Sequence, residues 1–366
     1  MRFDRRTFLQ ASAAVSLSPG LPRLASASGA FDPQPGPWRN FEIVTEIKIA
    51  KPYGKTQAWV PQPSVNETEW FRSLGSSWTG NGKITLMRDP KYGAAFVHVE
   101  WKEDETAPVI KVTSRISMRD RAVDLSKPTK VKPLSPDEYR FYTEGTKLIP
   151  VDGIVKETSD KIVGGTDTDV EKARAIYEWI VGNCFRDAKV RGCGIGDVAS
   201  MLKSGDLGGK CADLNALFVG LTRAAGVPAR DLYGIRVAPS RFGYKSLGAN
   251  SAVITKAQHC RAEVYLAGFG WVAADPADVR KVILEEPPGH LKINAPEVVA
   301  ARKTLFGAWE GNWFAYNFAH DVTLPGSHGP ELAFLMYPQG ECGNARLDCL
   351  DPDAFRYTIT ASEVAA

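Results

Sequence analysis

Hydrophobic and polar residues alternate along several short segments in the first third of the chain, and Gly, Pro, Asn and Asp separate these segments. The alternation covers residues 41–49, 83–87, 95–101 and 109–118. A period of two is typical of strands that bury one face. We therefore predict an antiparallel β-sandwich over residues 38–125, followed by a linker at 126–135 that contains two prolines.

Beyond the linker, apolar residues recur at the spacing of three and four that is typical of helices. Ser135 and Pro136 form a helix start, and Thr168 with Glu171 forms a capping box. A short helix is expected at 198–202, a longer one from residue 211, and strands from about residue 232. Helices followed by an antiparallel sheet make an α+β domain, which we assign to residues 136–366 with a C-terminal extension beyond residue 305.

The helix expected from residue 211 begins with a cysteine. Apolar residues at helical spacing follow Cys211, and Gly226 and Pro228 end the series. Unpaired N–H groups and the helix dipole favour a thiolate at this position, and Lys210 adds a positive charge. A buried, inert cysteine is the alternative, and a nearby base would argue against it.

A histidine and an aspartate that could serve such a thiol lie on a predicted hairpin. His259 begins one alternating strand, Asp275 ends the next, and Cys260 points to the other face. A three-residue loop that pairs Leu266 with Gly270 would put Asp275 diagonal to His259 on the same face. We predict this odd loop or a bulge, because it lets Asp275 orient the imidazole toward Cys211.

These segments resemble the core of the transglutaminase-like superfamily, whose papain-like domains use a Cys-His-Asp triad. The run GKCADLNALFVGLTRAAGVPAR and the run HCRAEVYLAGFGWVAADPAD carry the resemblance, which covers roughly residues 165–285. It implies that Cys211 is the nucleophile, His259 the general base and Asp275 the orienting acid. In two respects the chain departs from the family: Arg261 replaces an aromatic residue, and no glutamine shortly precedes Cys211 to complete an oxyanion hole.

The other histidines have weaker cases for a role. His320 precedes Asp321 in an aromatic-rich tail and is the alternative base, although nothing in the sequence brings it near Cys211. His98 lies in a predicted strand, and His290 and His328 lie in predicted loops. The aromatic group in the same tail is expected to pack in the core rather than to form a substrate wall; it comprises Trp309, Trp313, Phe314, Tyr316 and Phe318.

The first 27 residues resemble a twin-arginine export signal. Arg5 and Arg6 precede a short, weakly apolar stretch, and the sequence 25–27 offers a small-residue cleavage site. An ordinary secretory signal is the alternative. The sequence has no apolar run of about 18 residues that could span a membrane, and no cysteine follows the cleavage site to carry a lipid. We therefore expect no membrane anchor. We expect a periplasmic or secreted bacterial protein that meets the twin-arginine translocation machinery only during export.

Composition limits the possible partners. The chain has 366 residues, 44% of them hydrophobic, with 45 Lys and Arg and 42 Asp and Glu. Residues 1–27 hold four arginines and one aspartate, which leaves 41 charges of each sign. A neutral mature protein without zinc-finger, P-loop, GxGxxG, HExxH or CxxC patterns is not expected to bind nucleic acid, a metal or another cofactor.

A basic segment gives a prediction about the substrate. Residues 232–262 contain five cations and no acidic residue. A loop here beside the site would let Tyr244, Lys245 and Arg261 bind a substrate carboxylate, as in a peptide terminus or a cell-wall stem peptide. The alternative is a solvated face balanced by acids elsewhere.

The six cysteines of an exported protein also allow disulfides. Cys342 with Cys349 and Cys184 with Cys193 are the plausible pairs. Cys211 should be free, because a permanent disulfide would remove the nucleophile.

The preferred function is an exported cysteine-dependent hydrolase of peptide or amide bonds that acts through a thioester acyl-enzyme. A protein-crosslinking transglutaminase would use the same thioester with an amine as acceptor. A third hypothesis is a binding or scaffold protein whose triad is inactive, and the reactivity of the Cys211 thiol separates it from the other two.

Overall fold

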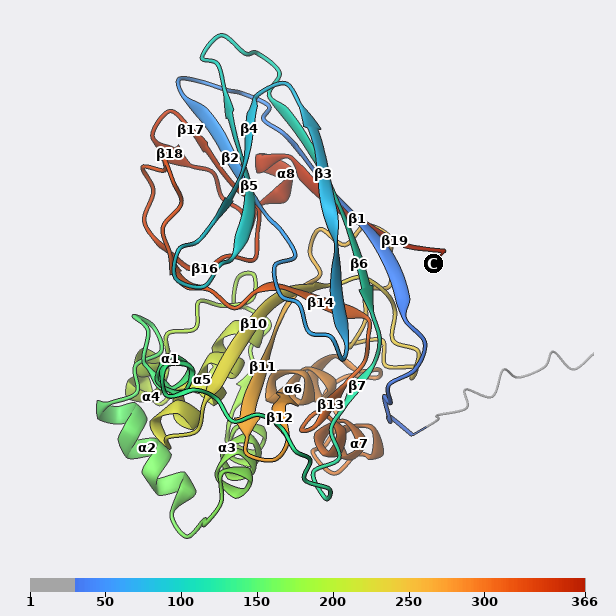
Figure 1. Cartoon of the computed structure of the whole chain (residues 1–366), viewed down its shortest axis with the longest axis vertical. Helices are drawn as coiled ribbons and strands as arrows, with labels where there is room; N and C mark the ends of the chain where they lie inside the picture. Colours follow the sequence, from blue (N-terminus) through green and yellow to red (C-terminus); the bar gives the residue numbers. More distant parts are fainter. Residues whose placement is uncertain (1–29, 366) are drawn as a thin grey trace, which may run out of the picture.

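The computed structural model describes residues 30–365, and its strands near the N-terminus form two facing sheets (Figure 1). One sheet contains, in spatial order, β19 (Tyr357–Val364), β1 (Arg39–Lys48), β6 (Val109–Met118) and β3 (Phe71–Gly80). The other contains β18 (Ala345–Arg346), β17 (Gln339–Cys342), β2 (Thr56–Pro61), β5 (Ala95–Trp101) and β4 (Lys83–Arg88). Alternate residues of both sheets share one hydrophobic core, which is the arrangement that the alternating pattern predicted.

The last strands of the chain complete these two sheets. β19 pairs antiparallel with β1 along its length, and β17 pairs with β2. In Figure 1 the C-terminal strand, coloured red, lies beside the blue first strand. The predicted boundaries at 38–125 and 136–366 stay predictions, but strands β17, β18 and β19 lie in the sheets that the N-terminal strands begin.

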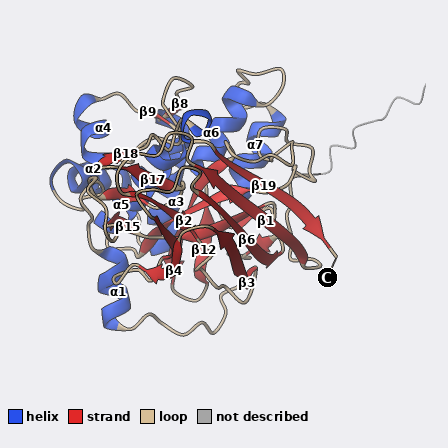
Figure 2. Ribbon diagram, turned by 90° about the horizontal axis from the view of Figure 1, so that it is seen from above, coloured by secondary structure: helices blue, strands red, loops and turns tan. Residues whose placement is uncertain are grey.

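The remaining elements form an α+β part below the sandwich in Figure 1, as predicted. Its sheet contains β12 (Gly270–Ala274), β11 (Gln258–Leu266), β10 (Ala229–Arg236) and β14 (Trp313–Asn317) in that order. Helices gather around one side of the strands, which Figure 2 shows in a view from above. They are α1 (Pro136–Thr143), α2 (Gly153–Val163), α3 (Asp169–Asn183), α4 (Val198–Ser204), α5 (Cys211–Ala224), α6 (Pro276–Glu285) and α7 (Pro296–Thr304); α8 (Pro352–Phe355) precedes β19.

The described residues also form three short strand pairs. They are β7 (Arg121–Ala122) with β13 (Ala308–Trp309), β15 (His320–Val322) with β16 (Leu332–Phe334), and the parallel pair β8 (Phe185–Arg186) with β9 (Gly208–Gly209). The β8–β9 pair lies directly before α5. It therefore fixes the approach of the chain to the helix that carries Cys211.

The predicted helix starts are present at the expected residues. Ser135 caps α1 and Thr168 caps α3, each in a capping box. Helix α5 begins at Cys211 and is buried on all sides, because it lies between the sheet and the helices α2 and α3. The sequence pattern did not predict β2, β3, α2, α6 or α7.

The hairpin of β11 and β12 has the predicted register. Leu266 pairs with Gly270, so the loop contains three residues. The last pair is Ala262 with Ala274, and Asp275 follows immediately as the N-cap of α6. This parity brings Asp275 to the face that carries His259.

The fold does not test the predicted export signal. The export signal at 1–27 lies outside the described residues. Among residues 30–365, no helix is both long enough and apolar enough to span a membrane.

Candidate active site

Cys211 occupies the first position of α5 and lies at the wall of a cavity. Its N–H has no hydrogen-bond acceptor within residues 30–365, as expected for the first residue of a helix. The carboxylate of Asp213 accepts from the N–H of Lys210 at 2.9 Å and fixes the turn. Gly209 permits this close approach, because a Cβ there would lie 2.6 Å from the Cβ of Asp213. The thiol is thus held at the positive end of a rigid helix.

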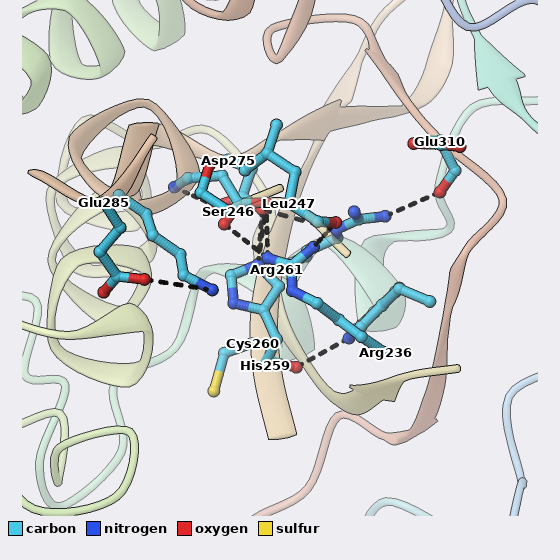
Figure 3. A network of polar contacts seen from close by, with 12 residues as sticks. Arg236, Ser246, Leu247, His259, Cys260, Arg261, Asp275, Glu285 and Glu310 are labelled. Atoms are coloured by element: carbon cyan, nitrogen blue, oxygen red, sulfur yellow. Dashed lines mark hydrogen bonds and ion pairs between the residues drawn. The ribbon is translucent and has the colours of Figure 1, made fainter. Parts of the chain in front are cut away.

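His259 and Asp275 lie together beside the cavity. The Nε2 atom of His259 is 2.8 Å from Oδ2 of Asp275, which leaves Nδ1 as the ring nitrogen available to Cys211. Asn215, one turn after Cys211, donates to the backbone oxygen of Cys260 at 2.8 Å and to Asp275 at 3.3 Å. Figure 3 shows the imidazole and the carboxylate side by side in a network of buried polar groups. The predicted hydrogen bond that orients the imidazole is therefore present.

A second carboxylate, which the sequence analysis missed, also faces the imidazole. Oδ2 of Asp278 lies 3.4 Å from Nε2 of His259. The N–H of Asp278 donates to Asp275 at 3.0 Å, and the carboxylate of Asp278 receives two hydrogen bonds from Arg236 at 2.6 and 2.8 Å. The sequence DPAD contains a signal for this arrangement, since an N-cap Asp and an acid three residues later stand on one side of a helix start.

These contacts favour a charged pair of thiolate and imidazolium. The hydrogen bonds of Cys193 and Cys260, and then the hydrogen bond and charge of His259, hold the pKa of the Cys211 thiol well below its usual range against the effect of burial. Burial and the charge of Arg236 lower the pKa of His259, but Asp278 and Asp275 outweigh them and raise it to about 9. Both shifts favour the thiolate of Cys211 and the imidazolium of His259 over the neutral pair.

The cavity beside this pair has a volume of about 620 Å³ and a basic wall. Cys193, Cys211, Gln258 and His259 line it on one side, and Leu350, Pro352 and Tyr357 from the end of the chain line it on another. No Asp or Glu is among the lining residues that the structure describes. Five basic residues are among them: Arg186, Lys210, Arg236, Lys256 and Lys281.

The residues predicted to bind substrate do not line this cavity. Arg261 is 2% exposed and lies behind the site, with Nε 3.5 Å from Asp275 and its guanidinium against Trp309 and Trp313. Figure 3 shows it in the network with Asp275 and Glu310. Arg261 shares the His259 face of β11, but Asp275 and the indoles of Trp309 and Trp313 surround its guanidinium, so it does not reach the cavity where it was predicted to bind substrate.

Tyr244 and Lys245 belong to the predicted loop but not to the part that faces the site. The Tyr244 hydroxyl donates to the backbone oxygen of Glu297 at 2.8 Å, and the Lys245 N–H donates to Glu286 at 3.0 Å. Residues 248–251 of the same loop line the cavity. The loop therefore does lie beside the site, through residues other than those the sequence singled out.

The structure also shows where the remaining histidine, aromatic and cysteine residues singled out in the sequence lie. His320 is buried, with Nδ1 3.2 Å from the Tyr233 hydroxyl, and it does not line the cavity. Trp309, Trp313 and Phe314 are buried in the core, as expected of the aromatic group. All six cysteines are free, so neither of the two disulfides considered forms. Cys193 instead faces Cys211 and Cys260, with the three Sγ atoms within 4.8 Å of one another.

Within residues 30–365, two groups of side chains have the spacing of metal ligands. They are the three thiols of Cys193, Cys211 and Cys260, and the set of His259, Asp275 and Asp278. In the second set, the guanidinium groups of Arg236 and Arg261 already neutralise the carboxylates at 2.6 and 3.5 Å. This set therefore suits the stabilisation of an imidazolium better than the binding of a divalent cation.

Comparisons with known proteins agree with this fold. Residues 156–276 match the Transglutaminase-like superfamily. An uncharacterized protein of Haemophilus influenzae is 39% identical over 329 residues, which cover 85% of this chain and 87% of that one. A crystal structure described as "a Putative Cysteine Protease" from Cytophaga hutchinsonii superimposes with a TM-score of 0.55 at 15% identity, over 90% of this chain and 92% of that one.

The buried helix that begins with cysteine, the adjoining antiparallel sheet and the matched residues define a transglutaminase-like domain. Within that class, the chain belongs to the same family as the Haemophilus influenzae protein. The similarity to the Cytophaga hutchinsonii structure concerns the fold.

Proposed function

We propose that the protein is an exported cysteine-dependent hydrolase that cleaves peptide or amide bonds through Cys211, His259 and Asp275. The observation that carries the proposal is the buried pair of Cys211 and His259 at the wall of a cavity, with two carboxylates behind the imidazole. An activated thiolate beside a proton donor is what acyl transfer requires. The periplasmic or extracellular location rests on the export signal.

The reaction would proceed in two steps. The thiolate of Cys211 attacks the carbonyl carbon, and the imidazolium of His259 gives its proton to the departing amine, which leaves a thioester. His259 then takes a proton from water as the resulting hydroxide adds to the thioester carbonyl, the C–S bond breaks, and the carboxylic acid leaves while the thiolate of Cys211 and the imidazolium of His259 are restored. With an amine in place of water, the same thioester would give transamidation, which is the second candidate.

Two donors at the cavity wall suit the oxyanion that forms during attack. The N–H of Cys211 has no acceptor within the described residues. The side-chain nitrogen of Gln258 is buried without a hydrogen-bond acceptor in that part of the chain, and this residue also lines the cavity. We assign Gln258 as the second donor, since a positioned amide contributes about 3 kcal/mol to such transition states.

The basic wall favours a substrate that carries a carboxylate, as a peptide terminus or a cell-wall peptide does. Arg236 pairs with Asp278, Lys256 with Asp353 at 3.6 Å, and Arg186 and Lys281 pair with Glu285. Lys210, directly before Cys211, forms no ion pair within residues 30–365. We assign Lys210 as the group that binds the substrate carboxylate.

The test compares peptides that end in a free carboxylate with the same peptides ending in a carboxamide. The Lys210→Gln variant should raise KM about tenfold for the free acids, the effect of losing about 1.4 kcal/mol, and leave KM for the amides unchanged. Lys203→Gln, on the exposed end of α4, is the matched control. Equal losses for acids and amides would contradict the carboxylate assignment. Retained hydrolysis in Cys211→Ala would contradict the proposed function itself.

A further inference from the structure

Two thiols beside Cys211 form no bond to the substrate in the proposed acyl transfer. The Sγ atoms of Cys193, Cys211 and Cys260 lie within 4.8 Å of one another, and all three residues are buried. Acyl transfer uses one sulfur atom. The other two lie close enough to react with it.

The cavity distinguishes the two neighbours of Cys211. Cys193 and Cys211 both line it, so a small solute that enters reaches both sulfur atoms. Cys260 is fully buried on β11, does not line the cavity, and has its Sγ 3.8 Å from the Sδ atom of Met336. Cys193 is therefore the neighbouring cysteine that lines the same cavity as the nucleophile.

The loop that carries Cys193 is fastened to the start of α5 at two points. The backbone oxygen of Cys193 accepts from the N–H of Ala212 at 2.9 Å. The carboxylate of Asp213 accepts from the N–H groups of Ile195 and Gly196 at 3.0 and 2.9 Å. These bonds keep the main chains of Cys193 and Cys211 adjacent, which a disulfide between them requires.

Glycine makes this approach possible. Gly194 has a φ of 89°, and a Cβ there would lie 1.8 Å from Oδ2 of Asp213. Gly192, on the other side of Cys193, also has a positive φ, of 55°. The loop is thus built to hold its cysteine against the helix start.

The two thiols are also chemically unlike. Hydrogen bonding from Cys193 lowers the pKa of Cys211, and the same contact raises the pKa of Cys193. One sulfur is a thiolate that attacks peroxides, and the other stays a thiol that can react with the product.

We propose that Cys193 is a resolving cysteine, which captures Cys211 in a reversible disulfide when hydrogen peroxide oxidises the nucleophile. In the first step, the Cys211 thiolate attacks one peroxide oxygen, the O–O bond breaks, and a sulfenic acid and hydroxide form. In the second step, the Cys193 sulfur attacks the Cys211 sulfur, the S–O bond breaks, and water leaves with the thiol proton. A dithiol reductant restores both thiols.

This disulfide would switch the enzyme off while protecting its nucleophile. Sulfenic acid that is not captured is oxidised further to sulfinic acid, which thiols do not reduce. The inference rests on the reactive Cys211 of the proposed function but not on the hydrolysis of any amide.

The experiment follows the mass of the reduced mature protein after exposure to hydrogen peroxide. Trypsin places the three cysteines on separate peptides, 192–203, 211–223 and 257–261, so each crosslink has its own mass. The wild-type protein should lose two hydrogens, yield the linked pair of 192–203 and 211–223, and recover fully with dithiothreitol. The Cys193→Ser variant should instead gain two or three oxygens on Cys211 and fail to recover. The Cys260→Ser variant, whose hydroxyl keeps a hydrogen-bond donor at this position, is the matched control and should form the same link between 192–203 and 211–223.

Other outcomes would overturn the proposal. The first is a crosslink between peptides 211–223 and 257–261 in the wild-type protein. The second is oxidation of the wild-type Cys211 to sulfinic acid without any crosslink. Mapping of the wild-type crosslink does not depend on the folding of a variant. Because the readout is mass, a protein that forms the link but hydrolyses no amide would refute the proposed function and leave this inference standing.

Discussion

The reactivity of the site depends on how two carboxylates share one imidazole. Asp275 forms the shorter contact with His259, at 2.8 Å, and Asp278 lies at 3.4 Å and is paired with Arg236. Burial and Asp278 raise the pKa of Asp275, whereas Arg236 and then His259 hold that of Asp278 well below its usual range despite its burial. The surroundings thus favour the charged form of Asp278, which in turn favours the imidazolium of His259, and Asp275 holds the ring at 2.8 Å.

The first prediction concerns the pH range of the imidazolium. His259 has a pKa of about 9, above its unfolded value of about 6.5. Its stabilising effect is therefore complete below about pH 6.5 and lost as the pH rises through about 9. Asp278→Asn removes the leading contribution that raises this pKa, and should move the titration of the imidazole, followed by NMR, to lower pH. Glu285→Gln, on the same helix, is the control, and an unchanged titration in Asp278→Asn would contradict the assignment.

At the scale of elements, the site depends on a loop that is pressed against a helix start. The loop at 192–196 contacts α5 through Asp213, and the pair of β8 and β9 holds the chain on the other side. The hairpin of β11 and β12 then supplies His259 and Asp275 from the sheet. Three elements from separate stretches of the sequence thereby meet at one thiol.

The second prediction concerns the closeness of the loop to the helix. Gly194→Ala should lower the free energy of unfolding by more than the roughly 1 kcal/mol that a positive φ costs alanine, because its Cβ would overlap the Asp213 carboxylate. Gly165→Ala is a matched control, since Gly165 has a φ of 88° with nothing within 4 Å of the added Cβ. Denaturant unfolding measures both variants. Equal losses would mean that the loop does not press on the helix as described.

Local sequence signals explain which of these elements were predictable. The apolar spacing after Cys211 predicted α5, and the parity of the hairpin predicted the meeting of His259 and Asp275. The position of Cys193 was not predictable, because it depends on hydrogen bonds from a loop to Asp213. The burial of Arg261 was also missed, because two tryptophans that follow almost fifty residues later form its environment.

At the scale of the whole molecule, the first and last strands of the described residues share one core. β19 pairs with β1, and the residues just before and within it, including Leu350 and Tyr357, line the cavity next to Cys211. The pairing of strands more than 300 residues apart has no local signal, so sequence patterns could not have predicted it. The sandwich therefore contributes directly to the wall of the candidate site.

The third prediction follows from the pairing of β19 with β1. Removal of residues 357–366 takes the buried side chains of Tyr357 and Ile359 out of the sandwich core and should lower the free energy of unfolding by several kcal/mol. The full-length mature protein should unfold in a single calorimetric transition. Two separate transitions, with the later one unaffected by the truncation, would contradict a shared core.

The central claim is that Cys211 is an activated thiolate because His259 is beside it. The most direct test is the rate of alkylation of Cys211 as a function of pH, measured by mass spectrometry on the reduced mature protein and on His259→Ala. The account predicts selective labelling of Cys211 near pH 6 that collapses in the variant. Labelling that follows an ordinary thiol of pKa about 8.5, and that the substitution leaves unchanged, would contradict the account and favour a binding protein.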